Sequence, residues 1–332
     1  MTLEPMSPNP IVPVFRSIDE VPRDFGPSIA VIGNFDGVHR GHRQILGAAA
    51  AEAQSRGMRS IAITFQPHPA QFLYPKEAPR LLTFLPERLK LLATTGVDAI
   101  LVLDFDEALS RVTAEDFVRD FLVGVLRVRG IHEGSNFRFG HGAKAGVNEL
   151  RSFGEEYGFN VHVHPAVRVH GLEVSSSAVR SLIAAGDLRR ARWMLGRVFG
   201  VHAHPAKGRG VGRKLLVPTV NLAAHEGLLP GFGVYVTRIT VGDKCFESVT
   251  NVGNRPTFEG VGFGVETHIL NFEPVDLTDE TPLILEFLFR LRGEMQWPST
   301  EALKAQIFKD VARAKRYFRA VAPRQGDPSL RW

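Results

Sequence analysis

Cysteine is nearly absent from this 332-residue chain, since Cys245 is the only one. A single thiol cannot form a disulfide within the chain. This excludes the small secreted domains that disulfides hold together, and it fits a reducing compartment. The zinc sites that are built on pairs of cysteines are excluded for the same reason.

Long apolar runs are missing as well. No stretch approaches the roughly 20 apolar residues that a membrane-spanning helix needs. The first residues, "MTLEPMSPNPIVPVF", show neither the basic segment nor the apolar segment that together mark a secretory signal. Their prolines predict a loose tail. We therefore expect a cytoplasmic protein that does not interact with a membrane.

Runs of like charge are also missing. The chain has 40 basic and 35 acidic residues, a net charge of +5 and a pI of about 9.5. No run of five basic residues occurs, so the sequence lacks the concentrated patch by which proteins bind nucleic acid. A modest excess of arginine either serves a small anionic ligand or has no function of its own. We expect small-molecule substrates and no nucleic-acid partner.

Strand and helix patterns alternate over the first half of the chain. Apolar or β-branched strands are expected at 28–34, 59–65 and 129–134, and another ends at Phe105. Ala-rich or amphipathic stretches lie between them. This βαβα order predicts a parallel sheet covered by helices, with ligands at the carboxyl ends of the strands.

The pattern changes after Phe199. Short strands punctuated by glycine and proline follow one another until a last amphipathic helix starts near Ser299. Such a pattern predicts an antiparallel barrel or sandwich with a terminal helix. The expected domain organisation is a tail at 1–14, an α/β domain at 15–186, linker helices at 187–198 and a β-barrel domain at 199–332.

The stretch "GNFDGVHRGH" follows the first strand and opens the first helix of the α/β domain. Two histidines, His39 and His42, lie three residues apart among glycines. They suit three uses: a metal site, a phosphate site or a turn. A helix N-terminus after a strand favours phosphate, because free N–H groups and the helix dipole attract anions. A metal site needs further ligands, and no HExxH pattern or cysteine pair is present.

This stretch resembles the signature of nucleotidylyl transferases, and its F-D-G-V-H form is similar to that of the bacterial bifunctional riboflavin kinase/FAD synthetases. Three other segments resemble the same family: "TFQPHPAQFL" at 64–73, "EGSNFRFGHGAKAG" at 133–146 and "VSSSAVRSLIAAGDL" at 174–188. Gln66 and Ser177 depart from the family pattern. The resemblance implies a Rossmann-like nucleotidylyl-transferase fold for the first domain.

The resemblance also implies an activity and its residues. FMN phosphate would attack the α-phosphorus of ATP, giving FAD and pyrophosphate, and positioning and charge stabilisation would suffice for this step. By the resemblance, His39, His42 and Arg180 act in catalysis. ATP would be bound by Gly33, Asn34, Phe35, Asp36, Gly37, His39, His42, Ser175, Ser176, Ser177 and Arg180. The flavin would contact His68, Asn136 and Phe137.

A second glycine-rich segment, "KGRGVGRKLLVPTVNLA" at 207–223, is no Walker A loop. It resembles the riboflavin kinase pattern, with Leu216, Val217 and Val220 as departures. The resemblance implies that ATP is bound by Gly208, Gly212, Arg213, Pro218, Thr219 and Asn221. Thr219 and Asn221 would also hold Mg2+, for which their side-chain oxygens are suitable ligands.

Downstream, Glu266 in "VETH" falls on the catalytic glutamate of the riboflavin kinase pattern. This base would take the proton of the riboflavin 5′-hydroxyl as ATP is converted to ADP. The segment "FRLRGEMQWPS" places Arg292 and Trp297 among the residues that would contact the flavin. Trp297 suits packing on a flavin ring or on the barrel.

The leading hypothesis is therefore a two-domain transferase that phosphorylates riboflavin to FMN and adenylylates FMN to FAD. Two alternatives remain. One is a transferase of the same superfamily with another acceptor, such as a phosphopantetheine or a nicotinate nucleotide. The other is a nucleotide- or flavin-binding protein that has lost catalysis.

Overall fold

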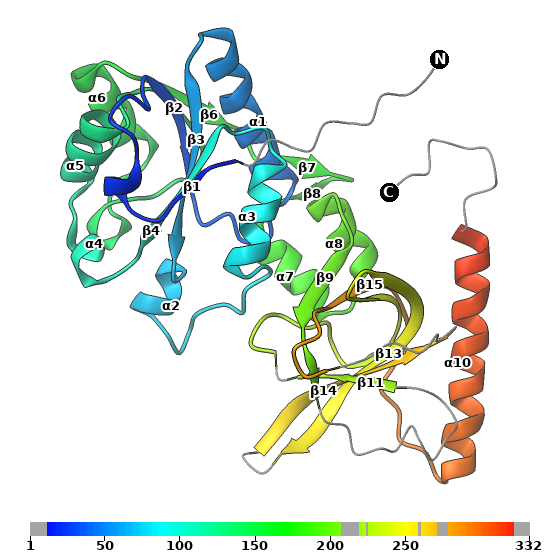
Figure 1. The fold of residues 1–332 in the computed structure, drawn as a ribbon. Coiled ribbons are helices and arrows are strands. Elements are labelled where there is room, and N and C mark those ends of the chain that lie inside the picture. Colours follow the sequence, from blue (N-terminus) through cyan, green and yellow to red (C-terminus); the bar gives the residue numbers. More distant parts are fainter. Residues whose placement is uncertain (1–11, 207–218, 224, 258–259, 271–277, 322–332) are drawn as a thin grey trace, which may run out of the picture. The chain divides into compact units, whose positions relative to one another are not determined.

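The computed structural model describes residues 12–206, 219–223, 225–257, 260–270 and 278–321 (Figure 1). The chain divides into two compact units, Met1–Ser176 and Ser177–Trp332. In the part of the chain that is described, no helix combines the length and the apolar character that crossing a bilayer requires.

The first unit contains a six-stranded parallel sheet in the order β1-β4-β3-β2-β5-β6. This confirms the parallel α/β fold that the sequence predicts. The strands are mostly apolar because helices cover both faces of the sheet. Their bounds are β1 Val14–Phe15, β2 Ser28–Ile32, β3 Arg59–Gln66, β4 Ala99–Asp104, β5 Val128–Gly134 and β6 Asn160–His164. Val14, at the end of the expected tail, thus starts the edge strand β1, which pairs with β4.

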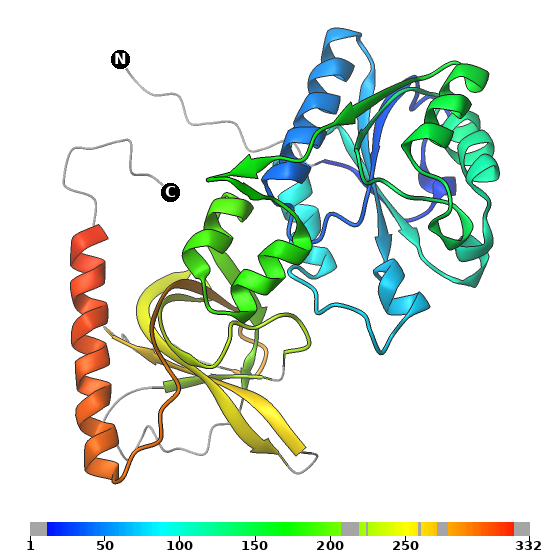
Figure 2. The same cartoon turned by 180° about the vertical axis from the view of Figure 1, so that it is seen from behind.

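Two apolar clusters hold the helices on opposite faces of the sheet (Figures 1 and 2). One face buries α1 and α3 through Leu46, Ala49 and Leu92. The other buries η2 and α6 through Leu122 and Leu150. The helices are α1 Arg40–Ser55, α2 Pro69–Leu73, α3 Leu85–Ala93, α4 Glu107–Arg111, α5 Ala114–Asp116, η2 Phe117–Val125 and α6 Val147–Tyr157. Short elements complete the unit: η1 Ile18–Glu20, η3 His141–Ala143, β7 Arg168–Val169 and β8 Leu172–Glu173.

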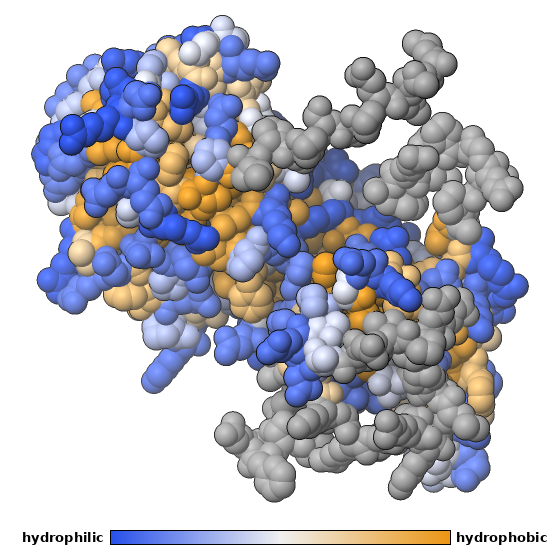
Figure 3. All heavy atoms as spheres, viewed as in Figure 1, coloured by the Kyte–Doolittle hydropathy of each residue, from blue (hydrophilic) through white to orange (hydrophobic). Residues whose placement is uncertain are grey.

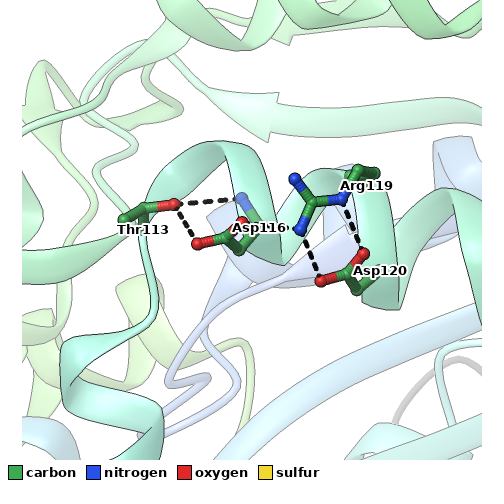
Figure 4. Close-up of polar contacts among 4 residues, drawn as sticks. All are labelled: Thr113, Asp116, Arg119 and Asp120. Atoms are coloured by element: carbon green, nitrogen blue, oxygen red, sulfur yellow. Dashed lines mark hydrogen bonds and ion pairs between the residues drawn. The ribbon is translucent and has the colours of Figure 1, made fainter.

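Thr113 is the N-cap of α5, and Figure 4 shows its contacts. The Thr113 hydroxyl accepts a hydrogen bond from the Asp116 N–H at 3.1 Å and donates to the Asp116 carboxylate at 2.7 Å. Arg119 joins the carboxylates of Asp116 and Asp120 (Figure 4). Acidic groups in the first turn suit the positive end of the helix. Beyond Asp116 the segment continues as the π-helix η2 rather than as the expected α-helix.

The second unit is built around a curled seven-stranded antiparallel sheet in the order β10-β11-β14-β13-β12-β15-β9. Its strands are β9 Phe199–Ala203, β10 Pro205–Ala206, β11 Thr219–Leu222, β12 Gly233–Val241, β13 Lys244–Thr257, β14 Gly260–Ile269 and β15 Leu283–Gly293. The strands β9 and β10 form the two edges of this sheet. Only His204 separates them in the sequence, so the two edges come from one continuous segment. This arrangement confirms the barrel-like second domain.

Among the described residues, the second unit has the helices α7 Ser176–Ala184, α8 Leu188–Leu195 and the terminal α10 Thr300–Val321. The last helix packs Ala314 and Phe318 against Val234 and Val236 of β12. Hydrophobic residues also reach the surface along α10, as Figure 3 shows, and Phe308 is 57% exposed. The terminal amphipathic helix that the sequence predicts is thus present.

Candidate functional site

The motif loop of the first unit follows β2 at the carboxyl edge of the sheet. Asp36 is buried there, and its carboxylate accepts hydrogen bonds from the N–H groups of Leu82 and Thr83 at 2.9 to 3.0 Å. Gly37 donates its N–H to the Thr83 hydroxyl and has a φ of 82°, which favours glycine. Asp36 therefore organises the backbone of the loop.

Strain is concentrated in the same loop. Phe35 and Val38 have φ angles of 48° and 36°, although neither is glycine. Left-handed backbone at such residues costs of order 1–3 kcal/mol each and persists where the surroundings impose it. Both side chains are buried in the cluster that covers α1. The core thus holds the loop in one conformation at the start of the helix.

His39 and His42 lie together at this helix start. The Nδ1 atom of His39 accepts a hydrogen bond from the His42 N–H at 3.3 Å, and the two rings stack with centroids 3.6 Å apart. Acceptance at Nδ1 places the proton of a neutral His39 on Nε2, where it can be donated to a phosphate. A Cβ at Gly41 would lie 3.1 Å from the His39 ring, so a residue as small as glycine allows this arrangement.

Arg88 was not predicted, but it holds two segments of the site together. Its side chain is 1% exposed and donates to the carbonyl groups of Asn34 at 3.0 Å and Phe65 at 2.9 Å, and to the Gln66 amide oxygen at 3.2 Å. Burial lowers the pKa of Arg88, and the nearby Asp36 opposes this effect. The sequence did hold a signal: Arg88 and Leu92 share the buried face of α3.

The strand order shows why these loops converge. Within the sheet, β2 lies between β3 and β5. The chain continues from β2 to β3 and then to β4 in one direction, and β5 is added next to β2 in the opposite direction. The β2 and β5 loops therefore flank the switch point, the usual ligand position in such sheets. Asn136 and Phe137 lie in the β5 loop, where Phe137 stacks on Phe139. His68, after β3, is buried and caps α2 by accepting from the Ala70 N–H.

A buried carboxyl group at this edge was also missed. Glu133, near the end of β5, accepts a 2.7 Å hydrogen bond from the Ile32 N–H at the end of β2. Burial raises the pKa of Glu133 well above its usual value, and the hydrogen bond opposes this rise. Residues 130–133 of β5 are all buried, and nothing in the local sequence predicts a buried carboxyl group among them.

The three predicted serines stand at the start of α7. The Ser176 hydroxyl donates to the Asp36 carbonyl at 2.9 Å, which ties this segment to the motif loop. Ser175 is half-buried and Ser177 is exposed. Arg180 is half-buried one turn further along α7, in the second unit.

A cavity of about 290 Å³ lies in the second unit between the sheet and α10. Thr219, Glu266, Arg292 and Trp297 all line it. Asn221 is directly opposite Glu266 across the β11–β14 pair, and Asn251 is opposite Glu266 across β13–β14. Directly opposed residues share a face of a sheet, so one carboxylate is placed between two amides. Asn251, which also lines the cavity, was not predicted.

Arg292 joins the sheet to α10 beside this cavity. Its guanidinium donates to the buried Asp310 carboxylate, with both N···O distances 2.9 Å, and lies 5.4 Å from the centre of the Trp297 ring. Asp310 also accepts from the Gln306 amide. Leu303, Ile307 and Val311, apolar residues of α10, line the cavity too. The predicted Gly208, Gly212, Arg213 and Pro218 lie outside the described residues, as do Leu216 and Val217.

Comparison with known proteins divides the chain in the same order as its motifs. The family model described as FAD synthetase matches residues 22–178, and the one described as riboflavin kinase matches residues 195–318. A bifunctional riboflavin kinase/FMN adenylyltransferase of Escherichia coli K12 is 34% identical over 296 residues, covering 89% of this chain and 94% of its own. One of Pseudomonas fluorescens is 36% identical over 288 residues, covering 86% and 92%.

A solved structure shares the fold. A crystal structure from Streptococcus pneumoniae, titled as a macrolide-efflux protein, superposes with a TM-score of 0.80 at 24% identity. It covers 91% of this chain and 98% of its own. At this identity the likeness supports the fold alone.

Proposed function

The chain belongs to the family of bifunctional riboflavin kinases/FMN adenylyltransferases, and we propose on this basis how its two units make FAD. The enzyme is a transferase: its C-terminal part phosphorylates riboflavin to FMN with ATP, and its N-terminal part adenylylates FMN to FAD with release of pyrophosphate. The observation that carries this function is the match of two family models in this order over most of the chain.

Adenylyl transfer needs no protein nucleophile, because FMN itself supplies the attacking phosphate oxygen. A new P–O bond forms at the α-phosphorus of ATP as the bond to pyrophosphate breaks. His39 and His42, at the positive end of α1, would donate to the phosphates and stabilise the charge on the leaving pyrophosphate. Arg180 and the serines at 175–177 would add to this clamp, while Asn136, Phe137 and His68 would contact the flavin.

Phosphoryl transfer needs a proton acceptor. Glu266 would accept the proton of the riboflavin 5′-hydroxyl as its oxygen attacks the γ-phosphorus and ADP leaves. Asn221 and Asn251, on either side, would orient its carboxylate. Arg292 and Trp297 border the same cavity, where a flavin ring would stack or pack. Gly208, Gly212, Arg213 and Pro218 would bind ATP.

Two side chains of β11 suit a magnesium ion. The Thr219 hydroxyl and the Asn221 amide carry hard oxygen atoms, and both residues are half-buried on β11 with one residue between them. They would hold Mg2+, which when bound offsets the negative charge of the ATP phosphates.

We also propose domain limits at 15–186 and 199–332, with linker helices at 187–198 and a tail at 1–14. The interval between the two family matches, 179–194, supports a connecting segment in this region. The single cysteine supports a cytoplasmic location.

The test is to incubate the pure chain with riboflavin, ATP and Mg2+ and to separate the flavins. We expect FMN to appear first and FAD to follow. A chain that only binds flavin would yield neither product. A transferase with another acceptor would consume ATP with a phosphopantetheine or a nicotinate nucleotide and not with FMN. Either result would overturn the proposed function.

A further inference from the structure

Two histidines contact one glutamate outside the predicted site residues, and a third histidine lies against one of these two. Glu52 lies near the end of α1, His132 is on β5, and His162 and His164 are on β6. His132 and His162 are register partners in the sheet, and His164 follows two residues later on the same face. Glu52 lies ten residues after His42, about 15 Å further along the helix, so this cluster is separate from the motif loop.

The contacts in the cluster are short. Glu52 Oε2 is 2.7 Å from His132 Nε2 and 3.1 Å from His162 Nε2. One ligand atom from each of these three residues lies within 4.8 Å of the others. In a tetrahedral zinc site with bonds of about 2.0–2.1 Å, ligand atoms lie roughly 3.3 Å apart. Shifts of about 0.2 to 0.6 Å would bring these two contacts to that spacing.

We propose that Glu52, His132 and His162 form a binding site for a divalent transition-metal ion, Zn2+ in particular. Two imidazoles and one carboxylate are a known type of zinc ligand set that leaves a fourth position open. The His162 side chain is 45% exposed, so solvent and the ion can reach the site. His132 is 4% exposed, so the inner side of the site is enclosed.

His164 has a separate part in this site. Its Nε2 atom is 3.0 Å from His132 Nδ1. When His132 binds the ion through Nε2, its proton lies on Nδ1 and is donated to His164. Such a partner fixes the tautomer and the ring orientation of a metal-bound histidine. A neutral His132 thus needs only a change of tautomer to bind the ion through Nε2.

The surroundings of Glu52 agree with this use. Gly130 on β5 leaves room for the carboxylate, since a Cβ there would lie 3.1 Å from Glu52 Oε1. The Arg56 guanidinium binds this same Oε1 atom at 2.6 Å, whereas the two histidines face Oε2. The arginine therefore orients the carboxylate through Oε1. The other oxygen, Oε2, faces the histidines and would bind the ion.

The test measures Zn2+ binding by the full chain without substrates, after treatment with a chelator, in competition with a chromophoric zinc chelator. We expect one Zn2+ per chain with a submicromolar Kd. At a free Zn2+ concentration about 100-fold above Kd, the Tm rises by roughly 5–10 °C. This readout is independent of flavin synthesis, so its failure would leave the proposed function untouched.

Variants separate this site from other histidines. His162→Ala and Glu52→Gln should each weaken Zn2+ binding by at least 10-fold and abolish the rise in Tm. Removing the partly exposed His162 ring opens no buried cavity. The matched control is His141→Ala, which removes an exposed histidine of the same unit and should leave Kd unchanged. Absence of submicromolar binding, or equal Kd values in His162→Ala and His141→Ala, would overturn the site.

Discussion

Asp36 illustrates how a single buried side chain can shape a loop. Its buried carboxylate accepts N–H groups from residues 46 and 47 positions later in the chain. Arg88 then binds the carbonyl groups of Asn34 and Phe65. Together these two residues hold the loops after β2 and β3 in fixed positions. Because the loop is already ordered, no conformational entropy would be lost in ordering it when the histidines bind a phosphate.

Replacement of Arg88 by methionine should destabilise the first unit. The variant keeps the length of the side chain but leaves two buried carbonyl groups without their donor. We expect the free energy of unfolding to fall by about 2–4 kcal/mol. Chemical denaturation measures it. The control Arg111→Met removes an exposed arginine and should change stability by at most about 0.5 kcal/mol. Equal losses in the two variants would contradict the role given to Arg88.

Glu133 predicts a dependence of stability on pH. Its pKa is raised in the folded state because burial disfavours the carboxylate. The unfolded chain therefore releases this proton at a lower pH than the folded protein does. Its contribution to stability is full below the ordinary glutamate pKa of 4.5 and is lost as the pH rises towards the folded-state pKa.

Glu133→Gln should remove this dependence. As the pH rises from 4.5 to 8, the Tm of the variant should increase relative to the Tm of the wild type. Thermal unfolding of both proteins across that pH range measures this difference. The control Glu155→Gln changes an exposed glutamate and should show no such trend. A difference in Tm that is constant over this range would show that Glu133 ionises equally in both states.

At the scale of elements, α10 contributes a wall of the second site. The Arg292–Asp310 ion pair joins it to β15, and the apolar residues Leu303, Ile307 and Val311 face the cavity. The helix therefore shapes the space in which Glu266 would act. Its position depends on a buried charge pair, which is strongly destabilising to break on one side only.

Asp310→Asn should impair the kinase reaction selectively. Loss of the negative charge leaves Arg292 without its ionic partner, and the attachment of α10 is weakened by roughly 3–5 kcal/mol. We expect FMN formation from riboflavin to fall at least 10-fold, while FAD formation from added FMN stays within about twofold. The control Asp279→Asn, at an exposed aspartate of the same unit, should affect neither rate. Equal loss of both reactions would contradict this account of α10.

The elements themselves were largely predictable from the sequence, whereas their partners were not. Apolar strands such as 28–34 depend on neighbouring residues, so local pattern predicts them. The contacts of Asp36 with Leu82, of Arg88 with Asn34 and of Glu52 with His132 join residues far apart in the chain. Local pattern has no information on such pairs. The 14–15 edge strand is too short to show a period, and the π-helical turns of η2 follow the same apolar spacing as an α-helix.

For the whole molecule, the central claim is one reaction for each of the two proposed domains. The measurement that tests it most directly is flavin product analysis for the wild type, His42→Ala and Glu266→Ala. We expect His42→Ala to lose FAD formation by about 100-fold or more while FMN formation stays nearly normal. Glu266→Ala should lose FMN formation and still convert added FMN to FAD. Loss of both reactions in either variant, with the chain still folded, would contradict the assignment.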